Sequence, residues 1–167
     1  MFCGVGGKSP VNTSRFRTST RERIRILQIY RRIAMVGLSR NPMRPSHFAA
    51  KYMLAAGYEI FPVNPSEKEI LGLPCFRSVL EVPRPVEIVD IFREAAAVPG
   101  IVEEAIQAGA KVIWMQLGVI HEQAAQRARD AGLEVVMDAC VKIEHARYHG
   151  GLNLLGLNTG VISSRKR

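Results

Sequence analysis

The chain has 167 residues, of which 47% are hydrophobic and 23% are charged. These values are typical of one soluble globular domain, long enough to bury a full core without disulfides or metals. No run of about eighteen apolar residues occurs, so we predict no transmembrane helix and no membrane partner. The three cysteines are scattered and lack C-x-x-C spacing, which argues against a disulfide framework. They favour a reducing compartment, and we predict a cytoplasmic protein.

The net charge of +8 is distributed unevenly along the chain. Residues 1–32 hold eight Lys or Arg and one Glu, and residues 165–167 are all basic. Residues 33–164, by contrast, hold 12 basic and 14 acidic side chains. No basic stripe interleaved with aromatic residues crosses this middle part, as a nucleic-acid platform would need. We therefore predict that the folded core binds no nucleic acid.

The two ends of the chain differ in composition from its middle. Residues 1–19 are basic, rich in Ser and Thr and free of acidic residues, and we favour a disordered leader over a transit peptide to an organelle matrix. Residues 149–167 are rich in Gly and Asn without a period, which predicts a tail. The folded domain is expected at residues 20–148, and residues 1–19 should be dispensable for folding.

The middle of the chain alternates between helical and strand patterns. Amphipathic segments, several followed by Gly, predict helices, and apolar runs without alternation predict strands buried on both faces. In chain order we predict helix 21–32 with Ser19 or Thr20 as N-cap, strand 33–37, helix 47–56, strand 58–63, a turn with a short edge piece at 69–76, a helical turn at 78–82, strand 86–92, helix 99–108, strand 111–117, helix 121–131, strand 134–137 and helix 141–148. This alternation predicts an α/β fold: three layers, doubly wound, with a mainly parallel five-stranded sheet.

In an open parallel sheet, ligands bind where the strands end, near the point at which the strand order reverses. The loop 37–46 after the first strand leads to a helix N-terminus, which attracts anions. Ser39 and Ser46 offer hydroxyl groups there, and Arg40 and Arg44 supply positive charge. We expect a phosphorylated ligand in this loop, with a surface loop that binds nothing as the alternative.

The loop departs from the common phosphate-binding fingerprints. A G-x-G-x-x-G motif that began at Gly37 would need glycines where Ser39 and Pro42 stand, and the Lys of a P-loop is missing. At the end of the second strand, Asn64 and Pro65 stand where a carboxylate usually holds the ribose of NAD. A simple NAD dehydrogenase is therefore disfavoured.

Gly37 ends the first strand and opens this loop. A residue without a Cβ lets a ligand approach the backbone closely, or it adopts a positive φ that other residues avoid. Of these two reasons for a glycine, we favour close approach of a ligand.

Several short blocks of the sequence, in the same order, resemble the stand-alone bacterial and archaeal CoA-binding family. Its members are similar to the CoA-binding domain of the succinyl-CoA synthetase α subunit. The blocks are VGLS (36–39), RPS (44–46), PVNP (62–65), VDIFR (89–93), WMQLG (114–118), VMD (136–138) and KIE (142–144). The resemblance covers about residues 20–148.

This resemblance implies a Rossmann-like fold that binds CoA or an acyl-CoA in a cleft at the carboxyl ends of the strands. It implies three groups of contacts: phosphates beside Gly37, Leu38, Ser39, Arg44 and Ser46; adenosine beside Asn64 and Pro65; and the remainder of the ligand beside Phe92, Arg93, Gln116 and Gly118. The synthetase's second domain, with its phosphorylated histidine, has no counterpart here. Its chemistry is therefore not transferred.

No catalytic or metal-binding residue is assigned from the sequence. Two sets of residues are interpreted as surface or capping groups: the four histidines, His47, His121, His145 and His149, and the acidic residues Asp90, Glu94 and Asp138. Cys140 stands near Asp138 and His145, which suggests a metal or thiol site, but we favour a packed thiol.

We favour a CoA-binding module without its own reaction. An acyl-CoA-utilising enzyme is one alternative, although no catalytic triad or carboxylate pair is visible. A binding protein for an NADP-type nucleotide is another, in which Arg40 or Arg44 would hold the 2′-phosphate. A protein partner and the oligomeric state are not predicted.

Overall fold

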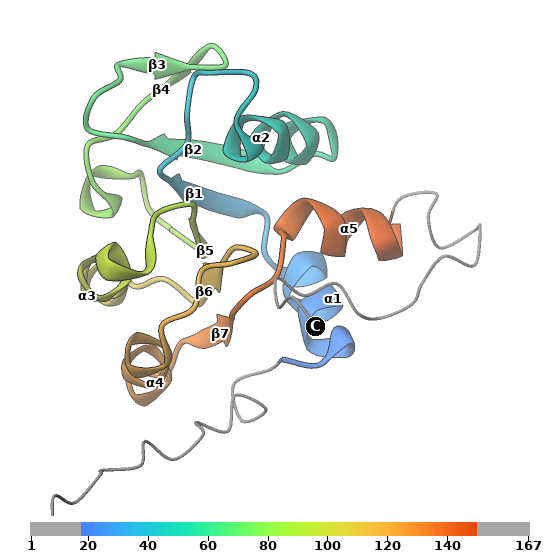
Figure 1. The fold of residues 1–167 in the computed structure, drawn as a ribbon, viewed down its shortest axis with the longest axis vertical. Helices are drawn as coiled ribbons and strands as arrows, with labels where there is room; N and C mark the ends of the chain where they lie inside the picture. Colours follow the sequence, from blue (N-terminus) through green and yellow to red (C-terminus); the bar gives the residue numbers. More distant parts are fainter. Residues whose placement is uncertain (1–17, 150–167) are drawn as a thin grey trace, which may run out of the picture.

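The computed structural model describes residues 18–149 (Figure 1). In chain order its elements are α1 (Thr20–Ile29), β1 (Arg32–Val36), α2 (Pro45–Ala55), β2 (Glu59–Val63), β3 (Glu69–Ile70), β4 (Leu73–Pro74), the 3₁₀ turn η2 (Val79–Glu81), β5 (Ile88–Ile91), the 3₁₀ turn η3 (Ala95–Ala97), α3 (Val98–Ala108), β6 (Val112–Met115), α4 (Glu122–Asp130), β7 (Glu134–Val136) and α5 (Val141–His149). Every strand and helix predicted from the sequence has a counterpart among them.

Five of the strands form one sheet in the order β2-β1-β5-β6-β7, and every neighbouring pair is parallel. Figure 1 shows α1, α2 and α5 on one side of this sheet and α3 and α4 on the other. The chain runs from β1 outward to β2 and then returns across β1 to β5. The strand order therefore reverses between β1 and β5. The predicted three-layer, doubly wound, Rossmann-like fold is confirmed.

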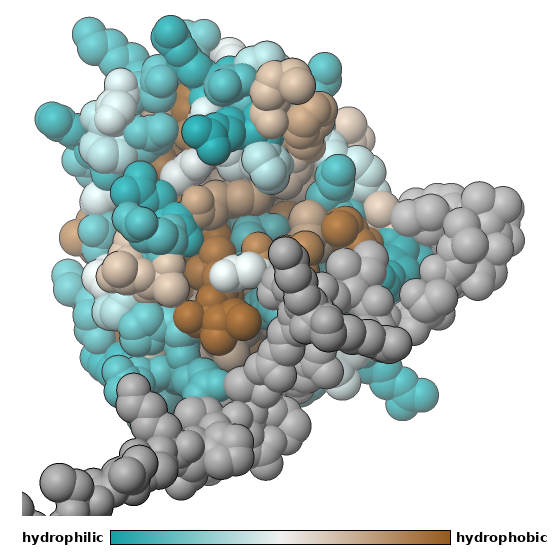
Figure 2. Space-filling model, in the orientation of Figure 1, coloured by the Kyte–Doolittle hydropathy of each residue, from teal (hydrophilic) through white to brown (hydrophobic). Residues whose placement is uncertain are grey.

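The sheet separates two hydrophobic clusters, one under each helical layer. In β1, Ala34 and Val36 pack toward α3 and α4, whereas Ile33 and Met35 pack toward α1, α2 and α5. Burial of both faces explains why the strands are mostly apolar and lack an alternation of apolar and polar residues. Figure 2 shows hydrophobic surface near the middle of one face of the molecule, with hydrophilic side chains around it.

The structure corrects several predicted boundaries. The first helix ends at Ile29, because Tyr30 is already extended (φ −101°, ψ 136°). The backbone N–H groups of Arg31 and Arg32 donate to Glu87 Oε2 at 2.7 and 2.9 Å, which aligns the start of β1 with the segment before β5. The edge piece at 69–76 is an antiparallel hairpin, β3–β4, closed by a tight turn.

The predicted leader (1–19) and tail (149–167) lie almost wholly outside the described residues, so their limits stay predictions. Ser19, however, belongs to the folded helix α1 as its N-cap. Its hydroxyl accepts from the Glu22 N–H (3.3 Å), while the Glu22 carboxylate accepts from the Ser19 N–H (2.6 Å). Within the described residues, no helix has both the length and the apolar character needed to cross a membrane.

This capping box generates a first prediction. Ser19→Ala should lower the free energy of unfolding by about 1 kcal/mol, because an N-terminal N–H of α1 loses its acceptor. Urea unfolding of the full chain measures the change, and Ser66→Ala, at an exposed serine outside the helices, is the control. Equal stability of the two variants would mean that the cap adds nothing to the fold.

Candidate functional site

A cleft of about 670 Å³ lies at the carboxyl ends of β1, β5 and β6, over the point where the strand order reverses. This is the place where open α/β sheets bind ligands. Its lining consists of Gly37, Ser39, Arg44, Pro45, Ser46, Phe92, Arg93, Glu94, Gln116, Leu117 and Val119. Seven of the eleven residues predicted for the site are among them: Gly37, Ser39, Arg44, Ser46, Phe92, Arg93 and Gln116.

The other four predicted residues lie near this cleft without lining it. Leu38 is fully buried, so its side chain serves the core. Asn64 donates from Nδ2 to the Leu38 carbonyl at 3.0 Å, which ties the end of β2 to the loop after β1, and the exposed Pro65 follows it. Gly118 is exposed between Leu117 and Val119, and its N–H donates to Asp138 Oδ1 at 2.8 Å.

Hydrogen bonds within the loop after β1 hold its shape. The Ser39 N–H donates to the Ser46 hydroxyl oxygen (3.1 Å), and the Ser39 hydroxyl oxygen accepts from the Asn41 N–H (3.1 Å). His47 Nδ1 lies 3.0 Å from the Ser39 carbonyl oxygen. The loop is thus tied to the first turn of α2 before any ligand binds.

The N-terminus of α2 opens at this cleft without a side-chain cap. Its N-cap residue is Arg44, which makes no capping hydrogen bond, and Pro45 occupies the first turn. The partial positive charge of a helix N-terminus therefore adds to the guanidinium groups of Arg44 and Arg93. Glu94 is the one acidic side chain in the lining. This electropositive edge can hold an anion.

Gly37 has a conformational reason to be glycine, contrary to the reason that we favoured from the sequence. Its φ is +85°, in the left-handed region. A Cβ at this position would also lie 2.8 Å from Arg93 Cδ and 3.1 Å from the Phe92 carbonyl oxygen. Backbone conformation and the crossing Arg93 side chain therefore suffice to explain this residue.

Asp90 is neither a capping nor a surface charge, contrary to the sequence interpretation. It lies in the middle of β5, between Met35 of β1 and Trp114 of β6, and its side chain is fully buried. Burial raises the pKa of Asp90 from 3.8 to about 8, although a hydrogen bond from Gln116 Nε2 to Oδ1 (2.6 Å) opposes the shift. The sequence signal that we missed was one acid inside an apolar strand.

The suggested metal site at Cys140, Asp138 and His145 does not form. Asp138 bonds to Gly118, and His145 lies between the rings of Tyr52 and Tyr58. His145 is therefore buried, not a surface or cap residue, whereas His121 does cap α4 by accepting from the Ala124 N–H at 3.1 Å. Among residues 18–149 no three His, Cys, Asp or Glu side chains gather as a metal site would require.

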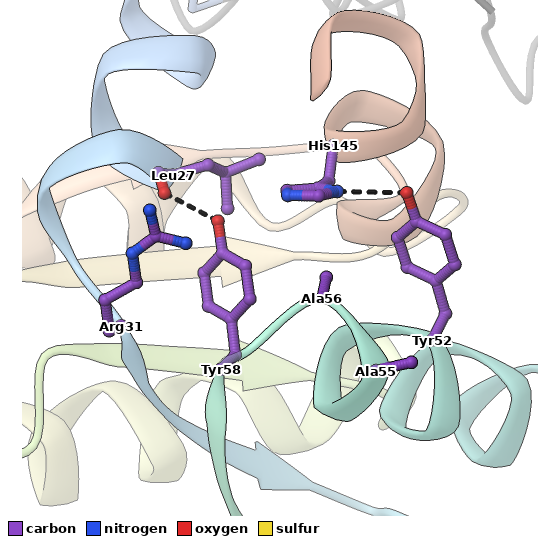
Figure 3. A pocket seen from close by; sticks show the side chains of 7 residues that line it. All are labelled: Leu27, Arg31, Tyr52, Ala55, Ala56, Tyr58 and His145. Carbon is purple, nitrogen blue, oxygen red and sulfur yellow. Dashed lines mark hydrogen bonds between the residues drawn. The ribbon is translucent and has the colours of Figure 1, made fainter. Parts of the chain in front are cut away.

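A second pocket, of about 450 Å³, lies at the amino ends of β1 and β2, away from the cleft. Figure 3 shows His145 of α5 and Tyr52 of α2 pointing toward each other, with a 3.0 Å hydrogen bond between His145 Nδ1 and the Tyr52 hydroxyl. The Tyr58 hydroxyl donates to the Leu27 carbonyl at 2.6 Å, and the Arg31 guanidinium stacks on the Tyr58 ring. These polar groups bind one another, and no residue predicted for the site lies here.

The geometry at Gly37 leads to a second prediction. Gly37→Ala should destabilise the protein more than Gly57→Ala, because both place a side chain at positive φ but only the Gly37 variant meets neighbouring atoms. The backbone alone should cost about 1–2 kcal/mol in each. Urea unfolding measures both, and Arg93→Ala should reduce the excess cost at Gly37. Identical losses in the two glycine variants would show that Arg93 moves aside freely.

A third prediction follows from the buried carboxyl group of Asp90. The folded protein keeps this proton up to about pH 8, whereas the unfolded chain releases it near pH 3.8. Between these values the native state binds more protons, so stability falls as pH rises, by up to about 1.4 kcal/mol per pH unit. The stability that the protonated Asp90 contributes relative to its ionised form is therefore complete below about pH 4, and it is lost by about pH 8.

Asp90→Asn keeps an acceptor for Gln116 and has no proton to lose, so this slope should disappear. Urea unfolding between pH 5 and 8 measures it. The matched control is Asp130→Asn, because Asp130 also accepts a hydrogen bond from a glutamine, Gln126 (2.7 Å), but on the exposed surface of α4. Equal slopes for wild type and Asp90→Asn would contradict a protonated Asp90.

Three comparisons relate this chain to known proteins. It is 46% identical over 121 residues to the uncharacterized protein YneT of Bacillus subtilis, covering 72% of this chain and 90% of that protein. It is 30% identical over 135 residues to the ADP-forming acetate–CoA ligase II of Archaeoglobus fulgidus, of which it spans about a fifth (19%). A solved hypothetical protein from Pyrococcus horikoshii superposes with a TM-score of 0.78 at 36% identity, covering 87% of this chain and all of that one.

The family model described as a CoA binding domain matches residues 31–146. This match spans β1 to most of α5, and it includes every strand end that lines the cleft. The similarity to an ADP-forming acetate–CoA ligase agrees with this family match, although the chain spans only 19% of that ligase. This chain belongs to the CoA-binding domain family, related to the CoA-binding region of ADP-forming acetate–CoA ligases.

Proposed function

We propose that this protein binds CoA or an acyl-CoA in the cleft at the carboxyl ends of β1, β5 and β6, without catalysing a reaction of its own. The observation that carries the proposal is the uncapped N-terminus of α2, which opens at the cleft beside Arg44 and Arg93. A polyanion is the ligand that such a site attracts.

The phosphate groups of CoA suit the β1 side of the cleft. Arg44 and Arg93 provide guanidinium donors, and Ser39 and Ser46 add hydroxyl groups on a loop that is already ordered by hydrogen bonds. Because little ordering remains to be done on binding, the entropic cost at this end of the ligand is small.

The remaining lining suits the pantetheine part of CoA. Phe92, Leu117 and Val119 offer apolar surface to its methylene and methyl groups. Gln116 is 5% exposed at the cleft and can accept from, or donate to, an amide group. The mixture of apolar walls with few polar groups is typical of ligand pockets.

An NADP-type nucleotide is the second candidate, but less of the site supports it. Of the two arginines considered for a 2′-phosphate, Arg44 lines the cleft, whereas Arg40 pairs with Glu67 (3.7 Å) and has a side chain that is 75% exposed. Arg40 does not line the cleft.

Thermal unfolding of the full chain with CoA, acetyl-CoA, NAD(H) and NADP(H) separates the two candidates, because a ligand at a hundred times its Kd stabilises the folded protein by about 2.7 kcal/mol. A shift with NADP(H) alone would overturn the proposal.

A fourth prediction concerns the phosphate end of the cleft. Arg44→Ala should weaken CoA binding by about 1–3 kcal/mol in titration calorimetry at moderate salt, because a charge-assisted contact is lost. Arg40→Ala is the matched control, because Arg40 stands on the same loop but outside the cleft. The Kd of this variant for CoA should equal that of the wild type. An unchanged Kd for Arg44→Ala removes Arg44 from the site.

A further inference from the structure

Cys140 stands at the N-terminus of α5, on the same edge of the sheet as the cleft. It follows β7, and interactions with the backbone N–H groups of Ile143 and Lys142 lower the pKa of its thiol, although burial raises it more. The preceding residue, Ala139, is fixed to β6 twice: its N–H donates to the Met115 carbonyl (3.3 Å), and its carbonyl accepts from Trp114 Nε1 (2.8 Å). The thiol is half-buried, so its position is set by the fold.

The carboxyl group of Asp90 lies close enough to Cys140 to act on it electrostatically. Its Oδ1 accepts from Gln116, but its Oδ2 is fully buried without a hydrogen-bond partner among the described residues. Gln116 is also part of the cleft lining. Gln116 therefore connects the cleft to Asp90 through a hydrogen bond, and Asp90 interacts electrostatically with Cys140. We call Cys140, Asp90 and Gln116 the thiol cluster.

The order of the strands predicts which end of CoA reaches the thiol cluster. The phosphate-binding loop follows β1, and β5, β6 and β7 come next along the sheet. Neighbouring strands lie about 4.8 Å apart, so the end of β7 is about 14 Å from the end of β1. A pantetheine arm anchored by its phosphate at β1 and extended over β5 and β6 brings its terminal sulfur to Cys140.

We propose that Cys140 is a covalent acceptor for the thiol end of CoA, which it captures as a mixed disulfide by exchange with CoA disulfide. This inference rests on the proposed CoA-binding function. The Cys140 thiol loses its proton to solvent, and the thiolate attacks one sulfur of CoA disulfide. A bond forms between Cys140 Sγ and that sulfur while the original S–S bond breaks. The second CoA leaves as a thiolate and takes up a proton, and an excess of a small thiol reverses the exchange.

The surroundings of Cys140 make this exchange dependent on pH. Burial and the Asp90 charge raise the pKa of the Cys140 thiol, whereas the N–H groups of Ile143 and Lys142 and the Lys142 charge lower it. Since the thiolate is the nucleophile, exchange should be slow near neutral pH and faster in alkali. Asp90 acquires its charge only near pH 8, so Asp90→Asn should match the wild-type rate at pH 7 and exceed it above pH 8.

The chain offers a matched control thiol in Cys75. Its Sγ donates to the Asn64 carbonyl at 3.4 Å, and burial raises the pKa of its thiol as well. It lies after β4, near the end of β2, on the opposite side of β1 from the thiol cluster. Cys75 is therefore a half-buried thiol that lies away from the thiol cluster, which makes it a suitable control for Cys140.

The fifth prediction tests the capture directly. Full-length wild type, Cys140→Ser, Cys75→Ser and Cys3→Ser are each incubated with CoA disulfide at about pH 8.5, where thiolates accumulate, and intact masses are recorded. One CoA adduct, released by dithiothreitol, is expected on every protein except Cys140→Ser. Glutathione disulfide, which lacks the nucleotide, should react with Cys140 at least about tenfold more slowly, because the cleft does not concentrate it.

The outcomes separate this inference from the proposed function. Calorimetry with reduced CoA must show that Cys140→Ser still binds, which also shows that this variant folds. Reduced CoA that binds while no adduct forms, or forms only on Cys75 or Cys3, overturns the inference and leaves the function intact. Equal rates with the two disulfides overturn it too. A chain that neither binds reduced CoA nor forms an adduct overturns both.

Discussion

Burial of the parallel sheet on both faces is the constraint on which the rest of this structure depends. Helices cover β1, β5 and β6 on either side, so their backbone groups are used in the ladder and their side chains in two cores. Polar groups can meet a ligand only where the strands end. The reversal of strand order between β1 and β5 sends the following helices to opposite faces, and the cleft opens between them.

Asp90 is the exception to this rule, and its environment determines its ionisation. A carboxylate without a counter-ion inside a sheet would be very costly, so the group stays protonated at neutral pH, with a pKa of about 8. Below that value Asp90, which is hydrogen-bonded to the cleft residue Gln116, is uncharged, while Arg44 and Arg93 supply positive charge to the lining. The fold thus combines two arginines in the cleft lining with a neutral carboxyl group that is hydrogen-bonded to Gln116.

The sequence predicted most of the fold because its signals are local. Mostly apolar runs without alternation identified the five strands, and residues placed directly after β1, β5 and β6 identified seven of the cleft residues. What could not be predicted depends on contacts distant in the sequence. The burial of Asp90 depends on its register with Met35 and Trp114, and the pairing of Tyr52 with His145 joins residues 93 positions apart. No local pattern carries such information.

Gly37 lines the cleft, but the structure gives a different reason for this glycine from the one that we favoured from the sequence. Its place at a strand end indicated a ligand loop, but a missing Cβ alone does not distinguish a ligand from a neighbouring side chain. In the structure that neighbour is Arg93, which crosses over Gly37. The absence of a Cβ at Gly37 therefore leaves the space that the Arg93 side chain occupies. The glycine lets the arginine lie across the turn, and in the proposed complex that arginine faces the same anion as Arg44. The glycine would then serve the ligand through Arg93.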